Sequence, residues 1–384
     1  MEKGRVILAT QALQKAIAGK KIALMMSCNA LDETGRILLD VITDQWRADV
    51  RFFFGMEHGV RGNFTAGDSG IDTTDKKTGL PVVNLYDYFE LRPPVEWVEK
   101  VDAVVFCAQD AGVRHWTFTP WMMTLIEAAA QANREVIILD LPNPIRGDIV
   151  EGAGVDEKFV GIEMLSGFSY PLRHGMTIGE LALMFNETKQ LGCKLTVLPM
   201  EGWRRDMWHD QTGLIWVPAS PNMPHNFTPL YFATTGLFQA ANVSCGVGTT
   251  TPFQYLGAPW VDGEAFANAI NDLAIPGLLA VQKYYPARIC ETPGLPLCDG
   301  AFLVCRDREQ YRPVTAQLQL MDILAKMYPG QFDLEKHYLS RPRMGTDAIC
   351  DRLQSGQSIA DLIPQWAQSA EAFAVARKPY LLYE

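Results

Sequence analysis

The sequence predicts a two-domain α/β protein whose first half folds around a parallel β-sheet. Short apolar runs alternate with helical patterns through the first half, which is typical of such a sheet. The chain has 384 residues, more than one hydrophobic core usually supports. A stretch rich in aromatic residues and proline, residues 200–223, separates the halves. We therefore predict one domain at residues 1–205 and a smaller α/β domain at 206–384.

The first half contains four predicted strands, and each of them runs into a polar residue. The predicted strands are residues 21–27, 51–54, 102–107 and 135–139, with helices at 36–47 and 119–133 and a loop at 63–79. The polar residues that follow the strands are Asn29, Glu57, Asp110 and Asp140. Ligands of open parallel sheets bind beyond the carboxyl ends of the strands, so we expect these side chains to converge there. The alternative is that loops after strands are simply polar.

The remaining elements are predicted from caps and periodicity. Thr177 and Glu180 form a capping-box pattern that predicts a helix over residues 177–190. The other predicted elements are strands at 194–200, 278–283 and 301–306, and helices at 263–273, 314–327 and 358–363.

The composition is that of a globular protein and excludes several classes of function. Hydrophobic residues make up 48% and charged residues 20% of the chain, and the net charge is −10 without any basic run. Nucleic acid is therefore not an expected partner. No stretch approaches the ~20 apolar residues that a membrane span needs, and the first residues lack a secretory pattern, so we expect a cytoplasmic protein. The sequence does not indicate an oligomeric state.

Motifs for cofactors and metals are missing from the expected places. No G-x-G-x-x-G follows the first strand and no P-loop is present, which disfavours a nucleotide-dependent oxidoreductase. The eight cysteines form no C-x-x-C pair, and no H-E-x-x-H occurs. We therefore expect neither a cofactor nor a metal ion.

The sharpest local signal is the segment at residues 55–62, Gly-Met-Glu-His-Gly-Val-Arg-Gly. Its glycines allow a tight turn at a strand end, where a substrate can approach the backbone closely. Burial there would keep the Glu57 carboxyl protonated and available as a proton donor, with His58 beside it. Arg61 is suited to bind a substrate carboxylate by a bidentate contact. The alternative is a loop stabilised by a Glu57–Arg61 ion pair.

Three further segments hold candidate binding residues. Arg173 and His174 precede the capped helix, where donors near a helix N-terminus suit an anionic group. The alternative for this histidine is a hydrogen-bonded loop residue. Trp203 and Asn222 lie in loop-like segments, where the tryptophan either stacks on a sugar ring or joins the two domains.

Several ordered motifs resemble the exo-β-N-acetylmuramidase (NamZ-type) family of glycoside hydrolases. They cover residues 21–353 and comprise the 55–62 segment, Gln-Asp-Ala-Gly-Val-Arg at 109–114, Asp-Leu-Pro-Asn-Pro at 140–144, Pro-Leu-Arg-His-Gly-Met-Thr at 171–177, Gly-Trp-Arg-Arg at 202–205, Pro-Asn-Met-Pro at 221–224 and Gly-Ala-Pro-Trp at 257–260. The resemblance implies a Rossmann-like N-terminal domain, a smaller C-terminal domain and a cleft between them. It also implies removal of terminal N-acetylmuramic acid from peptidoglycan fragments.

The resemblance and the residue patterns together give a set of candidate site residues. Glu57 is the candidate general acid, and the other candidate catalytic residues are His58, Asp110 and Asp140, since glycoside hydrolysis normally uses two carboxyl groups. The candidate substrate-binding residues are Asn29, Arg61, Arg114, Asn143, Arg173, His174, Trp203 and Asn222. The three arginines of this set, Arg61, Arg114 and Arg173, are candidates for binding the lactyl carboxylate of muramic acid.

One loop departs from the family pattern. Neutral Gln239, Cys245 and Val247 stand where the family usually has two glutamates and an arginine. Loss of these charges indicates a changed sugar specificity. A protein that binds sugars or peptidoglycan fragments without catalysis is the alternative to an enzyme.

Overall fold

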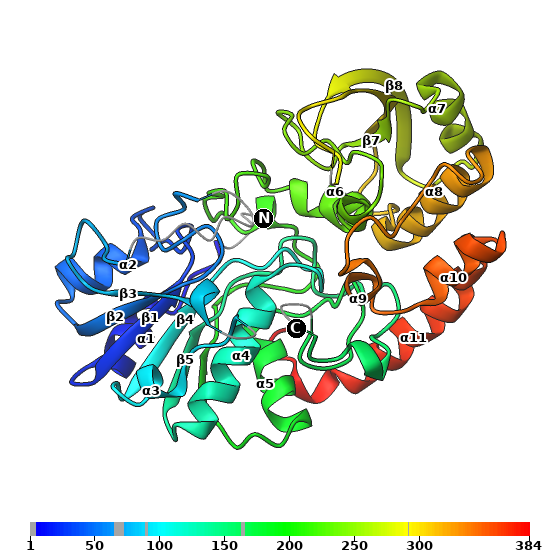
Figure 1. Ribbon diagram of the computed structural model, residues 1–384. Helices are drawn as coiled ribbons and strands as arrows, with labels where there is room; N and C mark the ends of the chain where they lie inside the picture. The colour runs from blue at the N-terminus through cyan, green and yellow to red at the C-terminus, as the bar shows by residue number, and fades with distance from the viewer. Residues whose placement is uncertain (1–4, 65–72, 89–90, 163–165, 291) are drawn as a thin grey trace.

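The computed structural model describes residues 5–64, 73–88, 91–162, 166–290 and 292–384, and shows a larger lobe and a smaller one (Figure 1). We call the larger lobe, built around a six-stranded sheet, the sheet domain. We call the three-stranded sheet with α6, α7 and α8 the small lobe. Among the described residues, no helix combines the length and apolar character that crossing a membrane requires.

The six strands of the sheet domain are all parallel and have the order β3-β2-β1-β4-β5-β6. Their bounds are β1 Lys21–Met26, β2 Asp49–Gly55, β3 Val82–Asn84, β4 Ala103–Cys107, β5 Glu135–Leu139 and β6 Lys194–Leu198. This is the strand order of a Rossmann-like fold, in which the order reverses between β1 and β4. The predicted α/β fold class is confirmed.

Both faces of this sheet are buried. Ala23 and Met25 of β1 belong to one hydrophobic cluster, and Ile22 and Leu24 belong to another. Successive side chains of a strand point to opposite faces, so a parallel sheet covered on both sides has nearly continuous apolar strands. The helices of the sheet domain are α1 Thr10–Ile17, α2 Leu38–Asp40, η1 Val41–Gln45, η2 Leu85–Asp87, α3 Val95–Val98, α4 Phe118–Gln131, η4 Glu157–Phe159, α5 Ile178–Thr188 and η5 His209–Gln211.

The small lobe has an antiparallel sheet of order β7-β9-β8. Its elements are α6 Thr228–Thr235, η6 Gly236–Ala240, β7 Tyr255–Ala258, α7 Gly263–Asp272, β8 Leu278–Pro286, β9 Leu297–Cys305 and α8 Pro313–Met327. The chain then returns to the sheet domain through α9 Ser340–Met344, α10 Ala348–Ser355, η7 Ile359–Leu362, α11 Ile363–Ala376 and η8 Lys378–Tyr380 (Figure 1). The chain thus crosses between the lobes twice, once before α6 and once after α8. The predicted division at residue 205 stays a prediction.

Most elements expected from the sequence are present, with informative exceptions. The capping box of Thr177 and Glu180 is present, with both of its hydrogen bonds. The helix expected over residues 36–47 is instead a short α2 followed by the π-helical turn η1. Sequence patterns did not predict α1, β3, α3, α6, β7, α9, α10 and most of α11; most of these elements span eight residues or fewer, and α11 is rich in alanine. Part of the loop expected at 63–79, residues 65–72, lies outside the described residues.

Candidate active site

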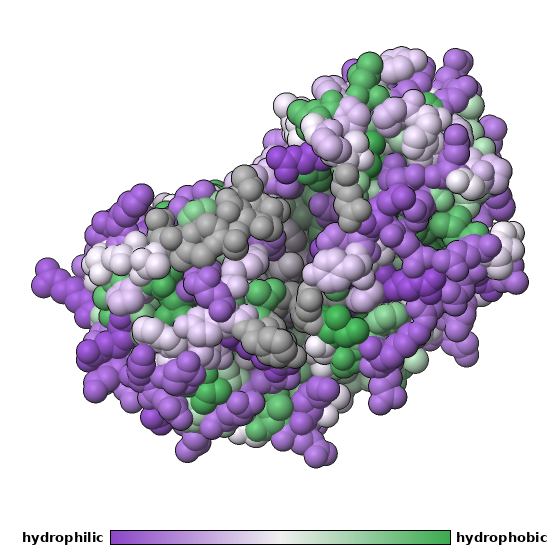
Figure 2. Space-filling view, in the orientation of Figure 1, coloured by the Kyte–Doolittle hydropathy of each residue, from purple (hydrophilic) through white to green (hydrophobic). Residues whose placement is uncertain are grey.

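A cavity of about 570 Å³ lies between the sheet domain and the segments that carry α6 and α9. The space-filling view shows the surface hollowed where the two lobes meet (Figure 2). Pockets for small molecules usually have volumes of about 300–1,000 Å³. The lining residues on the sheet-domain side are Glu57, His58, Tyr86, Leu91, His115, Trp116, Thr117 and Trp121. Those on the opposite side include Asn222, Phe232, Gln239, Phe253, His337, Tyr338 and Arg343.

A tight turn after β2 presents Glu57 to this cavity. His58 has a φ of 69° and Gly59 a φ of 71°, both in the left-handed region. The amide of Gly59 donates to the carbonyl of Met56 at 2.9 Å and closes the turn. Left-handed backbone in a residue other than glycine costs free energy and is concentrated at functional sites. The strained backbone at His58 therefore orients the side chains of Glu57 and His58.

The Glu57 carboxylate is half-buried and contacts the start of α4. Its Oε2 accepts a hydrogen bond from the Thr117 hydroxyl at 2.5 Å. Tyr86 lies close enough that the Glu57 charge adds to burial in raising the pKa of the phenol. One carboxylate oxygen is thus held by a hydroxyl at a helix end, and the side chain faces the cavity. This geometry is suited to a group that exchanges a proton with a bound ligand.

Aromatic and histidine side chains form the walls of the cavity around Glu57. His58 is buried, and its Nδ1 lies 3.1 Å from the carbonyl oxygen of Phe64, which fixes the ring. The pKa of His115 falls to about 3 because of burial and the nearby Arg114 guanidinium, so this imidazole is neutral at neutral pH. Trp116 and Phe232 contact edge to face, with ring centroids 5.8 Å apart. Such walls suit a ligand with apolar faces and a few polar groups.

Asp110 and His174 lie together behind this wall, outside the residues that line the cavity. Asp110 accepts hydrogen bonds from the Gly112 amide at 2.9 Å and the Thr119 hydroxyl at 3.2 Å. The His174 Nδ1 accepts from the Met176 amide, so Nε2 bears the hydrogen and faces Asp110 at 3.1 Å. The buried cluster ties the segment after β4 to the segment before α5.

Asn143, in the same region, is held by hydrogen bonds at both ends of its side-chain amide. Its amide nitrogen donates to the carbonyl of Met176 at 3.0 Å, and its side-chain oxygen accepts from the Ile145 amide at 3.1 Å. Both polar ends of this buried side chain are therefore satisfied by backbone, and it does not line the cavity.

Asp140 is fully buried at the end of β5. Its carboxylate accepts hydrogen bonds from the Thr177 hydroxyl at 2.7 Å, the Gly179 amide at 2.8 Å and the Tyr383 hydroxyl at 2.6 Å. Burial raises its pKa to about 7, and the nearby Glu180 charge acts in the same direction. The residue joins α5 and the C-terminal segment to the sheet.

Replacing Asp140 by asparagine should flatten the dependence of stability on pH. In the wild type, the folded state binds more protons than the unfolded state between the unfolded pKa of about 3.9 and the folded value of about 7. The free energy of unfolding therefore falls across this window, by roughly 4 kcal/mol at most. Urea denaturation at pH 5 and pH 8 measures the difference, with Asp206→Asn as an exposed control. An unchanged pH dependence in Asp140→Asn would contradict this account.

Asn29 lies elsewhere along the same edge of the sheet. It borders a cavity of only about 30 Å³ with Gln109, at the point where strand order reverses. Arg5, Leu8 and Ile215 also border this cavity. The four side chains that were expected to converge, those of Asn29, Glu57, Asp110 and Asp140, all follow strands at the same edge of the sheet. Of the four, only Glu57 lines the large cavity.

The three arginines predicted to bind a substrate carboxylate have partners within the protein. Arg61 makes a bidentate pair with Asp75 at 2.8 Å and also contacts Asp40 at 2.7 Å, which raises its pKa. Arg114 donates to the carbonyls of Ala153, Tyr170 and Met344. Arg173 is fully buried and pairs with Glu151 at 2.7 Å. None of the three lines the large cavity.

The two remaining predicted binding residues differ in their location. Trp203 is buried, and its ring meets that of Tyr383 edge to face with centroids 5.0 Å apart. It therefore joins the 202–208 segment to the C-terminal segment. Asn222 lines the large cavity and also an adjoining cavity of about 360 Å³.

Two arginines at these cavities were not predicted from the sequence. Arg343 lines the large cavity, and Arg288 lines the adjoining one. Neither lies in a motif that the sequence singled out, so only the fold reveals them. The adjoining cavity is also lined by the three residues that depart from the family pattern, Gln239, Cys245 and Val247. Within the described ranges, no group of three or more metal-ligating side chains occurs.

Comparison with known proteins covers nearly the whole chain. Residues 22–227 match the family described as exo-beta-N-acetylmuramidase NamZ, N-terminal, and residues 230–383 match its C-terminal counterpart. The chain is 32% identical over 370 residues to the peptidoglycan beta-N-acetylmuramidase NamZ of Bacillus subtilis, covering 96% of this chain and 88% of that protein. Two crystal structures of DUF1343 family proteins from Bacteroides fragilis match with TM-scores of 0.89 and 0.76, at 30% and 26% identity. Each match covers 99% of both chains.

Proposed function

The chain belongs to the exo-β-N-acetylmuramidase NamZ family, and from that premise we propose that it removes a terminal amino sugar from peptidoglycan fragments, with Glu57 as general acid. The sugar is N-acetylmuramic acid or a close relative. Membership of the family makes the protein a glycoside hydrolase. The specific sugar and the role of Glu57 are our proposals.

The position of Glu57 is the observation that supports this role most strongly. Among the described residues that line the large cavity, Glu57 is the one carboxylic acid. Its contact with the Thr117 hydroxyl holds one oxygen, and the aromatic walls suit a sugar ring. We propose that His58, fixed by the Phe64 carbonyl, positions the glutamate and the ligand.

We propose positioning roles for the other two predicted catalytic acids. Asp110 and Asp140 are buried, have hydrogen-bond donors within the protein and do not line the cavity. Asp110 with His174 holds the segment after β4, which carries His115 and Thr117 to the cavity. The expected cytoplasmic location stays a prediction.

Arg343 is the residue that we propose for the lactyl carboxylate of muramic acid, because it lines the cavity with Glu57. Arg343→Met should raise KM for a muramic acid glycoside by about tenfold or more, the effect of losing a charge-assisted hydrogen bond. KM for the matching N-acetylglucosamine glycoside, which has no carboxylate, should not change. Steady-state kinetics with both substrates measures the difference, with Arg288→Met in the adjoining cavity as control. Equal effects on both substrates would contradict the assignment.

An activity screen tests the function itself. Purified protein is incubated with chromogenic β-glycosides of N-acetylmuramic acid, N-acetylglucosamine and glucose, and with peptidoglycan fragments that begin with muramic acid. We expect release from the muramic acid glycoside and from the non-reducing end of the fragments. If calorimetry shows that the fragments bind but no sugar is released, the protein is instead a non-catalytic binding protein. The neutral residues Gln239, Cys245 and Val247 are consistent with that alternative.

A further inference from the structure

The large cavity has an enclosed aromatic floor and an open aromatic rim. Trp116, Trp121, Phe232 and Phe253 line it and are between 1% and 8% exposed, so their rings are mostly covered by the protein. Tyr338 lines the same cavity from the segment before α9 and is 75% exposed. An exposed ring at the edge of a cavity is placed to contact whatever the cavity binds.

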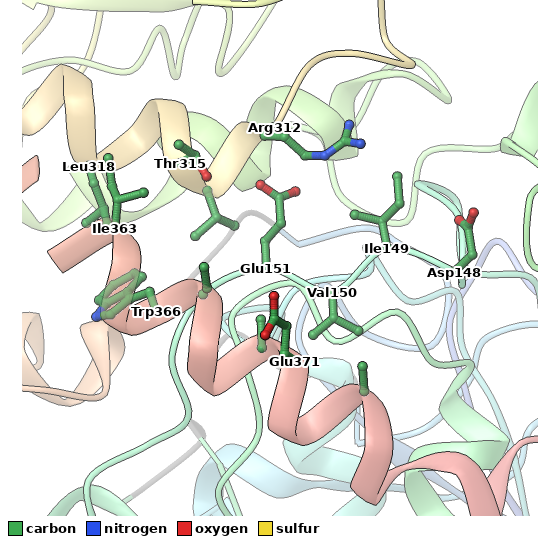
Figure 3. A pocket seen from close by; sticks show the side chains of 15 residues that line it. Asp148, Ile149, Val150, Glu151, Arg312, Thr315, Leu318, Ile363, Trp366 and Glu371 are labelled. Carbon is green, nitrogen blue, oxygen red and sulfur yellow. The ribbon is translucent and has the colours of Figure 1, made fainter.

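The cavity shown in Figure 3 differs in this respect. It has a volume of about 410 Å³ and lies between the 148–152 segment, α8 and α11. The aromatic side chain among its described lining residues is Trp366, which is 5% exposed. An open aromatic ring is thus a feature of the large cavity and not of this one.

The Tyr338 ring is supported on one side by His337. The two rings stack with their centroids 4.7 Å apart and their planes 28° apart. The Nδ1 of His337 accepts a hydrogen bond from the Leu339 amide at 3.1 Å, which holds the imidazole in place. Because the imidazole covers one face of the phenol ring, the opposite face is the one that a ligand can contact.

The backbone that carries these two rings is anchored to the wall of the cavity. The hydroxyl of buried Ser340 donates to the carbonyl of His337 at 2.6 Å and accepts from the amide of His337 at 3.3 Å. The Lys336 amide donates to the carbonyl of Ala240 at 3.1 Å, at the end of η6 and next to Gln239, which lines the cavity. A surface that is ordered before binding loses less entropy when a ligand arrives.

The position of Glu57 decides which part of a fragment lies toward the rim. A general acid protonates the oxygen that joins the terminal sugar to the next one, so this oxygen lies within hydrogen-bond reach of Glu57. The terminal sugar then lies on the side of the enclosed rings, and the next sugar lies toward the rim. In peptidoglycan the sugar that follows muramic acid is N-acetylglucosamine, whose ring has C–H groups that form an apolar face.

From these observations we propose that Tyr338 binds the second sugar of the fragment by stacking on the face of its N-acetylglucosamine ring. This inference rests on the proposed function, because it takes Glu57 as the point of cleavage. Tyrosine offers a large, rigid contact area at a low cost in conformational entropy. The protein should therefore prefer fragments of two or more sugars to a single muramic acid residue.

Calorimetry on the Glu57→Gln protein, which leaves the ligand uncleaved, tests this contact. The disaccharide of N-acetylmuramic acid β-linked to N-acetylglucosamine should bind about tenfold more weakly when Tyr338→Ala is added, as expected for loss of an aromatic contact. N-Acetylmuramic acid alone should bind equally with and without Tyr338→Ala, because it does not reach the rim. Tyr338→Phe keeps the ring and should retain the affinity. Absence of disaccharide binding, unchanged disaccharide affinity in Tyr338→Ala, or an equal loss for the monosaccharide would overturn the proposal.

Kinetics in the protein with Glu57 intact separate this contact from the activity. Tyr338→Ala should raise KM for the disaccharide about tenfold and change kcat by less than about twofold, the pattern of lost ground-state binding. Tyr284→Ala is the control, because Tyr284 is 61% exposed on β8 and does not line the large cavity. If the disaccharide binds through Tyr338 and no sugar is released, the proposed activity is wrong and the contact stands. If sugar is released and Tyr338→Ala has the wild-type KM, the contact is wrong and the activity stands.

Discussion

Replacing Glu57 by glutamine is expected to lower kcat on peptidoglycan fragments by roughly 10²-fold or more, with little change in the melting temperature. Glutamine keeps the size of the side chain and can still accept from the Thr117 hydroxyl. It has no acidic proton to give to the leaving oxygen, and general acid catalysis contributes about 10²–10⁴-fold. Release of amino sugar by the variant and the wild type, compared under identical conditions, gives the ratio.

The leaving group distinguishes an acid from other roles of Glu57. A sugar leaving group needs protonation, whereas a nitrophenolate leaves readily without it. The loss in Glu57→Gln should therefore be large on the natural fragments and much smaller on the nitrophenyl glycoside. Glu264→Gln, an exposed change at the start of α7, is the control and should retain full activity. Full activity of Glu57→Gln on both substrates would exclude the residue as the acid.

Replacing Arg173 by alanine should destabilise the fold by about 3–5 kcal/mol, the usual cost of removing one partner of a buried ion pair. The Arg173 side chain is fully buried, and the Glu151 carboxylate that it pairs with is 7% exposed. Without the guanidinium, the Glu151 charge remains buried without its ion-pair partner. Urea denaturation measures the loss. Arg204→Ala is the control, because Arg204 and Asp206 are 54% and 56% exposed and such surface pairs contribute about 1 kcal/mol or less.

A double variant separates a structural role for Arg173 from substrate binding. In Arg173→Met with Glu151→Met, both buried charges are removed, and apolar replacement of a buried pair is often neutral. We expect the double variant to recover at least half of the stability that Arg173→Ala loses. It should also keep the wild-type KM, since the arginine does not line the large cavity. A raised KM in a stable double variant would show that Arg173 contacts the substrate.

Local sequence predicted five of the six strands of the large sheet and the helices α4 and α5, because apolar runs and caps are local features. It did not predict α1 or β3, and residues 36–47 contain a short α2 and the turn η1 in place of the expected helix. The apolar run at residues 135–139 forms β5 with the same bounds, and Thr177 caps α5 through its hydrogen bond with Glu180. Glu57 was placed at a strand end by the glycines around it, and the structure has that turn. Each of these features depends on residues close together in the chain.

The partners of the charged side chains could not be predicted in this way. Arg114 donates to the carbonyl of Met344, 230 residues away, and Asp140 accepts from Tyr383, 243 residues away. Arg343 reaches the large cavity only because α9 returns to the sheet domain after the small lobe. No local pattern distinguishes an arginine that will meet a buried carbonyl from one that will meet a ligand.

The sequence by itself determined the fold class, the family and the strand end that carries Glu57. Backbone propensity, apolar periodicity and ordered motifs depend on residues that are close together in the chain. The tertiary structure alone decided which polar groups face the cavity and which are enclosed. The physical reason is that burial and charge pairing depend on distant segments brought together by folding. For this reason Asp110, Asp140 and Arg173 belong to the motifs at residues 109–114, 140–144 and 171–177 but are buried outside the cavity that Glu57 lines.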